Sequence, residues 1–301
     1  MLVPRSAFAT ALLGLLLASA APSFAQNVTT FASGYNVARG LLADGNGNLY
    51  LSQRFTTGQI VRFTPPSNVP TFIASGFTDI IEMALDDAGN LYASDYGANK
   101  IWKITPAHVK SDFAHVFAPA PMTRDAAGNL YVGDYSNLHA YKITPAGDTA
   151  TYAIMPGTTA HNRLAALRMT SDGTLYMGSE EGTVYAVGPG GAPITTFATG
   201  LPRLLSLQTD FSGGWFAATY DFNTIVRIFP DGSHATFAGT GVAGLVNGPL
   251  LTSRFNAPTG LAIVGGTLYI ADETNDAVRA IDLGLTNTAT STWGRLKALY
   301  R

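Results

Sequence analysis

The 301-residue sequence contains no cysteine, which excludes disulfide bonds and thiolate metal sites. Charged residues make up only 13% of the chain, and 18 Lys and Arg nearly balance 20 Asp and Glu. This balance gives no indication of a nucleic acid or an anionic membrane as partner. Helical periodicity is absent after residue 25, which predicts an all-β protein. Its stability must come from the packing of apolar side chains.

The first 25 residues have the pattern of a secretory signal peptide. Arg5 supplies a positive charge, an apolar run covers residues 11–20, and small residues form a cleavage site before Gln26. That run is too short to span a bilayer, and no second run approaches the roughly 20 residues of a transmembrane helix. We therefore expect a secreted or periplasmic protein that does not stay at a membrane after export.

A short motif recurs six times along the rest of the chain. Each copy is a turn rich in Asp, Gly and Asn, followed by a strand with an aromatic residue, as in residues 84–95 (ALDDAGNLYASD). The aromatic positions are 39 to 53 residues apart, at Tyr50, Tyr92, Tyr131, Tyr176, Phe216 and Tyr269. A period of this size is typical of propeller blades. The sequence predicts that residues 26–301 form a single six-bladed β-propeller.

The residues of each repeat predict four antiparallel strands. The turn joins an inner strand to a short apolar second strand, because Gly and Asn tolerate positive φ and Asp binds the backbone that follows. The third strand alternates apolar and cationic residues, as in residues 100–104 (KIWKI), and a fourth precedes the next copy, as in residues 194–200 (ITTFATG). The predicted fold is all-β with four-stranded antiparallel blades.

Either end of the chain could close the ring. Residues 29–34 (TTFASG) and residues 290–294 (TSTWG) both resemble the fourth-strand runs, and only one of them is needed. We favour the N-terminal run, because it leads directly into the first inner strand and removes a sheet edge. Residues 284–301 are then a C-terminal tail or an extra outer strand.

The last repeat resembles an NHL repeat. The residues that carry the resemblance are FAGTGVAG from residue 237, NGP from residue 247, RFNAPTGLA from residue 254 and LYIADETNDAVR from residue 268. The resemblance implies a six-bladed propeller of the broad group that includes gluconolactonases, strictosidine-synthase-like proteins and streptogramin lyases. It implies no particular reaction, since such folds carry unrelated functions.

Function is expected where loops meet the central channel. We place on one face the links from each outer strand to the next inner strand, together with the links between second and third strands. This face combines aromatic residues with charges of both signs, which suits a small molecule or a peptide, although ordinary loops have a similar composition. With residues of the inner strands, it provides these candidate ligand-binding residues: Arg39, Glu82, Tyr96, His161, Arg163, Arg168, Arg203 and Tyr220.

Three inner strands carry polar side chains where other copies have Leu42 and Ala84. The polar residues are Thr123, Arg168 and Gln208, with Arg124 beside the first. Such side chains are costly there unless they reach channel water or a partner. Arg168 could pair with Glu82 or a carbonyl. Alternatively, an anionic small molecule or a peptide carboxylate is received by arginines on one side of the mouth: Arg39, Arg163, Arg168 and Arg203.

The resemblance also implies an alternative, a metal-dependent lactonase-like hydrolase or lyase. Gluconolactonase relatives hold a divalent ion with Glu, Asn and Asp residues just before the Gly of a Gly-x-x-x-Asp pattern, here Gly40 to Asp44. None of the equivalent residues is a carboxylate or an amide: Arg39, Ile81, Ala120, Ala165, Leu205 and Thr259. Glu82 lies one residue away and is alone. We therefore expect no metal and no cofactor, and we assign no catalytic residue.

The aspartates that end three second strands have a structural interpretation. We expect Asp95, Asp134 and Asp272 to bind the backbone of the following loop rather than a ligand. The sequence as a whole predicts an exported, monomeric NHL-type propeller. We expect it to act as a binding or scaffold module for a small anionic ligand, a peptide or a protein on the channel-mouth face.

Overall fold

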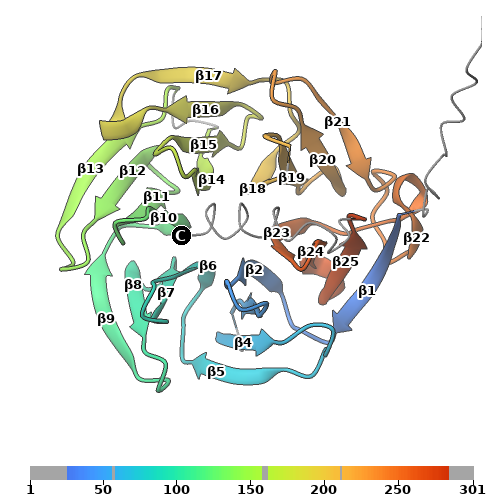
Figure 1. Ribbon diagram of the computed structural model, residues 1–301, viewed down its shortest axis with the longest axis horizontal. Helices are drawn as coiled ribbons and strands as arrows, with labels where there is room; N and C mark the ends of the chain where they lie inside the picture. Colours follow the sequence, from blue (N-terminus) through green and yellow to red (C-terminus); the bar gives the residue numbers. More distant parts are fainter. Residues whose placement is uncertain (1–25, 56–57, 158–161, 211, 285–301) are drawn as a thin grey trace, which may run out of the picture.

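The computed structural model describes residues 26–55, 58–157, 162–210 and 212–284, and these residues form a six-bladed β-propeller (Figure 1). The all-β prediction and the blade count are therefore confirmed. The expected signal peptide (residues 1–25), the run at residues 290–294 and His161 lie outside the described residues. Within the part that is described, no helix is long and apolar enough to cross a membrane.

Five blades are four-stranded antiparallel sheets made of consecutive strands, numbered from the channel outward. Blade I contains β2 (Ala38–Ala43), β3 (Leu49–Gln53), β4 (Gln59–Phe63) and β5 (Thr71–Ser75). Blade II contains β6 (Ile80–Leu85), β7 (Leu91–Asp95), β8 (Lys100–Ile104) and β9 (Lys110–His115). Blade III contains β10 (Pro119–Arg124), β11 (Leu130–Asp134), β12 (His139–Ile143) and β13 (Thr149–Ile154).

The next two blades follow the same order. Blade IV contains β14 (Leu164–Met169), β15 (Leu175–Ser179), β16 (Val184–Val187) and β17 (Ile194–Ala198). Blade V contains β18 (Leu204–Thr209), β19 (Trp215–Thr219), β20 (Thr224–Ile228) and β21 (His234–Ala238). Within the described segments, short 3₁₀ helices occupy three connections: η1 (Pro189–Gly191), η2 (Leu250–Thr252) and η3 (Glu273–Asn275).

Blade VI combines strands from both ends of the sequence. Its inner three strands are β23 (Pro258–Val264), β24 (Thr267–Asp272) and β25 (Ala277–Asp282), followed outward by β1 (Asn27–Ser33) and the two-residue β22 (Gly248–Pro249). β1 lies along β25, with Val28 opposite Ile281 (Figure 1). Val28 is fully buried, so this contact is packed as well as hydrogen-bonded. Closure by the N-terminal strand is confirmed.

The core lies between neighbouring blades. All residues of the second strands β3, β7, β11 and β19 are buried, as expected for strands covered on both faces by adjacent sheets. Phe31 on β1 packs edge-on against Phe63 of blade I and Tyr269 of blade VI, with ring centres 5.4 and 5.0 Å apart. The closing strand therefore joins two blades through its side chains as well as completing one sheet.

Each inner strand is irregular where it pairs with its second strand. The register shifts between Ala38 and Leu41 in β2 and between Ile80 and Met83 in β6. A bulge of this kind bends a strand and redirects side chains, so Arg39 and Glu82 lie at positions that regular pairing does not constrain. The neighbouring strands are very close here, since a Cβ on Gly40 would lie 2.4 Å from the Ile81 carbonyl oxygen.

We predict that stability depends on β1 far more than on the other end of the sequence. A chain that begins at Tyr35 should lose at least about 3 kcal/mol of unfolding free energy, because it exposes the edge of β25 and the apolar surface that Val28 covers. Denaturant unfolding measures the loss. Deletion of residues 293–301 is the control, and equal losses would contradict this assignment of the closing strand.

Candidate functional site

One end of the channel is organised by a backbone hydrogen bond that all six blades share. The residue after each second strand donates its N–H to the carbonyl of the residue just before the inner strand, at 2.8 to 3.3 Å. The six donor residues are therefore structurally equivalent, and we call them the mouth ring: Arg54, Tyr96, Tyr135, Glu180, Tyr220 and Glu273. Three of the acceptors are charged residues, Asp79, Arg163 and Arg203.

Glu180 is the centre of one half of the mouth. Its carboxylate accepts hydrogen bonds from the Arg203 guanidinium and from the Tyr135 hydroxyl. Burial, and then the Glu180 carboxylate, raise the pKa of Tyr135, so this hydroxyl keeps its proton and acts as a donor. Arg203 also approaches Asp221 at 3.4 Å, and its guanidinium lies 5.2 Å from the ring centre of Tyr220. The charge of Arg203 is thus already balanced.

Arg163 is held more loosely. Its Nε lies 3.6 Å from Glu180 Oε2, and its guanidinium lies 4.9 Å from the ring centre of Tyr135. The Arg163 side chain is 45% exposed, compared with 33% for Arg203. Tyr96 packs edge-on against Tyr135, with ring centres 6.0 Å apart. Arg163 is therefore the more accessible cation in this half, and the Tyr135 ring lies beside it.

The other half of the mouth is a compact set of ion pairs. Arg39 Nη1 lies 2.6 Å from Glu273 Oε2, and Arg54 binds Asp79 in a bidentate pair at 2.5 and 2.7 Å. Arg54 Nη1 also lies 3.6 Å from Glu273. These four side chains come from blades I and VI and from the loop that leads into blade II. The two cations and two anions neutralise one another. Because Arg39 of blade I pairs with Glu273 of blade VI, it links these two blades.

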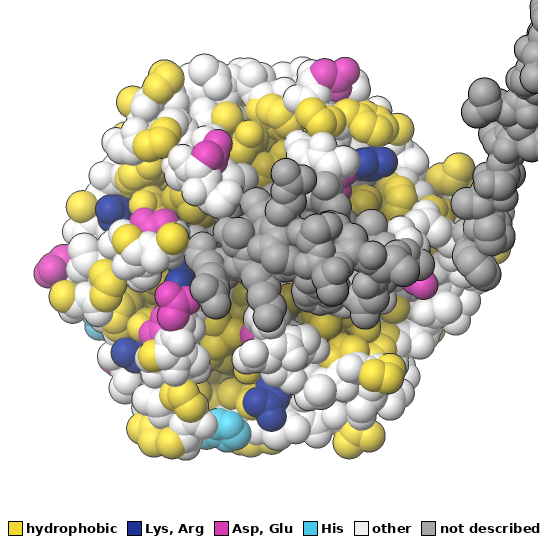
Figure 2. Space-filling model, viewed as in Figure 1, with side chains coloured by type: hydrophobic (Ala, Val, Ile, Leu, Met, Phe, Trp, Pro, Cys, Tyr) yellow, Lys and Arg dark blue, Asp and Glu magenta, His cyan; other side chains and the backbone are white. Residues whose placement is uncertain are grey.

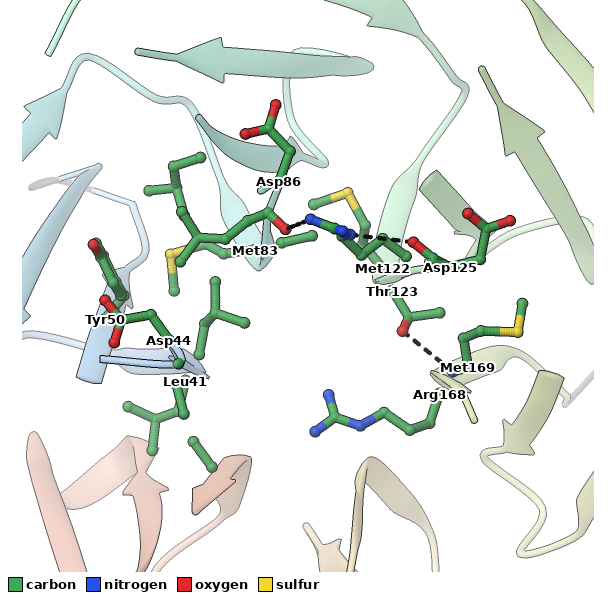
Figure 3. Close-up of a pocket in the computed structure, with 18 of the residues that line it drawn as sticks. Leu41, Asp44, Tyr50, Met83, Asp86, Met122, Thr123, Asp125, Arg168 and Met169 are labelled. Carbon is green, nitrogen blue, oxygen red and sulfur yellow. Dashed lines mark hydrogen bonds between the residues drawn. The ribbon is translucent and has the colours of Figure 1, made fainter. Parts of the chain in front are cut away.

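Arg168 does not lie with the other arginines, and the prediction that all four line one side of the mouth is wrong. Arg163 immediately precedes β14, whereas Arg168 lies near the opposite end of this strand, about 16 Å away at the rise of an extended chain. Arg168 lines a cavity of about 1230 Å³ beside the turns between first and second strands, together with Thr123 and Gln208 (Figure 3). Its guanidinium binds the Gln208 side-chain oxygen.

Glu82 is the one carboxylate of the predicted set, and it lies in the bulge of β6. Its Oε1 accepts the N–H of Met83 at 3.1 Å, and its own N–H donates to Ser94 Oγ at 3.0 Å. Burial raises the pKa of Glu82 to about 7, against the opposing effects of the Met83 N–H and of the Arg168 and Arg39 charges. Glu82 can therefore gain or lose a proton near neutral pH.

The strand-ending aspartates bind backbone as the sequence predicts, but not always that of the following loop. Asp134 does so, Asp95 binds the following loop at Ala98 and also the loop before the inner strand, and Asp272 binds backbone only in the loop before the inner strand among the described residues. Asp95 accepts the N–H groups of Thr78 and Asp79 at 2.9 and 2.8 Å, and Asp134 accepts those of Ser136 and Asn137. Asp272 accepts the Asn256 N–H at 2.7 Å and also pairs with Arg279 at 2.8 Å, where both side chains are 0% exposed.

Arg279 fastens the long loop before blade VI. Its guanidinium donates to the carbonyls of Arg254 and Val246 in addition to Asp272. Sequence reasoning missed Arg279, because a cation in an alternating third strand normally faces water. It placed Arg54, Tyr135 and Glu180 on the candidate face but left them, and Glu273, out of the candidate ligand-binding residues. The signal was available, since each directly follows the last residue of a repeat motif.

Charges on the visible face are dispersed. Figure 2 shows Lys and Arg side chains separated from one another and interspersed with Asp and Glu, with no continuous basic stripe on this face. Among the described residues, no group of three or more His, Asp or Glu side chains is arranged to hold a metal ion.

Comparison with known proteins supports the fold and nothing narrower. No protein-family model matches the sequence, and no curated protein sequence matches it. Solved structures do match. An auxiliary nutrient binding protein from Bacteroides ovatus has a TM-score of 0.72 at 16% identity, with 85% of this chain and 76% of that chain covered.

Virginiamycin B lyase from Staphylococcus aureus has a TM-score of 0.63 at 16% identity, covering 85% of this chain and 98% of that one. A protein proposed to be a gluconolactonase has a TM-score of 0.65 at 14% identity, covering 85% and 92%. At these identities the likeness establishes the six-bladed propeller fold, and the proteins that share it include both binding proteins and enzymes.

The raised pKa of Glu82 predicts a pH-dependent effect of Glu82→Gln on stability. A carboxyl whose folded pKa is about 7, above its ordinary 4.5, contributes stability below pH 4.5 that is lost as the pH rises through 7. Glu82→Gln removes the buried charge, so it should be more stabilising at pH 8 than at pH 5, by roughly 1 to 3 kcal/mol. Urea unfolding of both proteins at the two pH values measures this difference. A pH-independent effect would show that Glu82 is well solvated.

Proposed function

We propose that the protein is an exported binding module whose mouth ring receives a small molecule or a peptide that carries an anionic group. The observation that carries the proposal is Arg163. Its side chain is about half exposed, its one ion pair among the described residues spans 3.6 Å to Glu180, and its guanidinium lies beside the Tyr135 ring. An arginine in this setting can form a charge-assisted, bidentate contact with a carboxylate while the neighbouring ring contacts the apolar part of the ligand.

The surrounding residues supply a scaffold for such a ligand. Glu180 holds both Arg203 and Tyr135, which fixes the tyrosine ring against which Arg163 packs. Tyr96 extends the aromatic surface on one side and Tyr220 on the other. Aromatic rings with two rotatable side-chain bonds give large contact areas with little loss of entropy, as in peptide- and protein-binding surfaces.

In this proposal the ligand contacts are Arg163, Tyr96, Tyr135 and Tyr220, and Arg203 and Arg39 position the loops. Two proteins of similar fold are described as auxiliary nutrient binding proteins, which supports a binding role. The export pattern of residues 1–25 supports a secreted or periplasmic location, and the last repeat supports an NHL-type propeller. We further propose a monomer that binds no nucleic acid, in keeping with its balanced charge.

We predict that Arg163→Ala and Asp272→Ala have opposite effects. Arg163→Ala should weaken binding of a carboxylate-bearing peptide by about 1.5 to 3 kcal/mol and leave folding stability nearly unchanged. Asp272→Ala should cost about 3 to 5 kcal/mol of stability, because it leaves Arg279 buried without its counter-ion. Calorimetric titration and denaturant unfolding of the same proteins measure the two effects.

The probe is a panel of short peptides with a free terminal carboxylate, screened first by thermal shift. The same peptides with an amidated terminus are the matched control, since they keep every other contact. Equal binding of the two forms would refute the anionic-group proposal. A stability loss for Arg163→Ala as large as that for Asp272→Ala would show that Arg163 is structural.

The alternative is a metal-dependent hydrolase or lyase similar to the gluconolactonases, and Glu82 is the observation that favours it. A carboxyl with a pKa near 7 in the channel has the proton affinity of a general acid or base. If the protein is a binding module, we predict that calorimetric titration with Ca²⁺, Mg²⁺ and Zn²⁺ detects no ion bound in a stoichiometric amount. An ion bound with micromolar or tighter affinity, and lost in Glu82→Gln, would favour the enzyme.

A further inference from the structure

The cavity beside the turns between first and second strands lies at the opposite end of the channel from the mouth ring, and none of the mouth-ring residues lines it. Its volume of about 1230 Å³ is large enough for a small organic molecule. Each of the six inner strands contributes to its wall the residue that pairs with the aromatic position of the second strand. We call these six equivalent residues the cavity ring: Leu42, Ala84, Thr123, Arg168, Gln208 and Ala262.

The cavity ring has a polar half and an apolar half. Thr123, Arg168 and Gln208 come from the neighbouring blades III, IV and V, and the three apolar members come from blades VI, I and II. Leu41 and Met83 add buried apolar surface on the second side. In Figure 3, the Arg168 side chain extends from its strand into the cavity, toward the side on which Leu41 lies. The cavity is therefore amphipathic across its width.

The polar half has donors that the protein uses weakly. Among the described residues, the Arg168 guanidinium binds the Gln208 side-chain oxygen, and its charge acts on Glu82 without forming an ion pair. Gln208 Nε2 makes long contacts of 3.5 Å to the carbonyl and hydroxyl of the next residue. Thr123 Oγ1 accepts the Met169 N–H at 3.2 Å, so its own O–H can still donate. Gln208 and Thr123 are 1% and 7% exposed, and a buried donor without a good acceptor is costly.

The carboxylates on the cavity rim already have partners. Asp87 pairs with Arg124 and Asp210 pairs with Arg227, at 2.8 Å in each case. The other rim aspartates accept hydrogen bonds from their own turns: Asp44, Asp86, Asp125 and Asp172. These acidic groups therefore hold the turns, whereas Arg168 presents its charge to the interior of the cavity.

We propose that this cavity binds a small monocarboxylate with an apolar body. The ligand carboxylate accepts a bidentate pair of hydrogen bonds from the Arg168 guanidinium, with the donors of Gln208 and Thr123 on either side. The hydrocarbon or aromatic body of the ligand lies against the apolar half of the cavity ring. This site is separate from the mouth ring, and the proposal does not depend on what the mouth ring binds.

Octanoate and octanamide are suitable probes, because they share a hydrocarbon body and differ in charge. In calorimetric titrations of the full chain, octanoate should bind at least about tenfold more tightly than octanamide. Arg168→Met should remove most of this preference, since it keeps an unbranched side chain but not the charge. Arg124→Met is the matched control. Arg124 lines the same cavity but is paired with Asp87, so the preference for octanoate should persist in that variant.

Methionine methyl signals in NMR spectra show where octanoate binds. Met83 and Met122 line the cavity, whereas Met155 is buried between blades and does not. Octanoate should shift the signals of Met83 and Met122 and leave that of Met155 in place. This measurement uses the unaltered protein, so it decides the question even if Arg168→Met fails to fold. Equal binding of the two probes, no binding at millimolar octanoate, or binding that shifts neither cavity methionine, as at the mouth ring, would overturn the proposal.

Discussion

The backbone hydrogen bond from the residue after each second strand to the residue before each inner strand sets the geometry of the mouth. It is repeated in all six blades, so it fixes six side-chain positions around the channel without using the side chains themselves. The hydrogen bond uses only backbone atoms, so it does not itself dictate which residue stands at each position. Arginine, tyrosine and glutamate stand there, and their contacts with the neighbouring acceptor residues give the mouth its chemistry.

Charge is distributed unevenly around this symmetric frame. The pairs formed by Arg39, Arg54, Asp79 and Glu273 neutralise one another where blades I, II and VI meet, close to the junction made by the N-terminal strand. Across the channel, Glu180 is shared by two arginines, and one of them is only loosely paired. The first group stabilises the ring, whereas the second leaves a guanidinium available to solvent. Pairing geometry, rather than the number of arginines, separates the half of the mouth whose charges are fully paired from the half with an accessible guanidinium.

The sequence was sufficient for the fold because turn, aromatic strand and spacing repeat together, and each of these signals is local. It was also sufficient for the closing strand, since residues 29–34 lead directly into the first inner strand. It failed for Arg168, because polarity on an inner strand indicates access to the channel but not which end of it. It failed for Arg279 because the partner that permits full burial, Asp272, lies on the adjacent strand and the loop carbonyls lie some 25 to 33 residues away.

The pairing of β1 with β25 also affects the order in which the protein can fold. Val28 is among the first residues of the propeller to be synthesised, and its partner Ile281 is among the last. Blades I to V can form from neighbouring strands as they emerge, but β1 has no sheet to join until residues 277–282 are made. A contact of such sequence separation forms slowly, and until then the edges of β1 and blade VI are both exposed. The step that completes the ring is therefore also the one during which the chain is most open to pairing with another molecule.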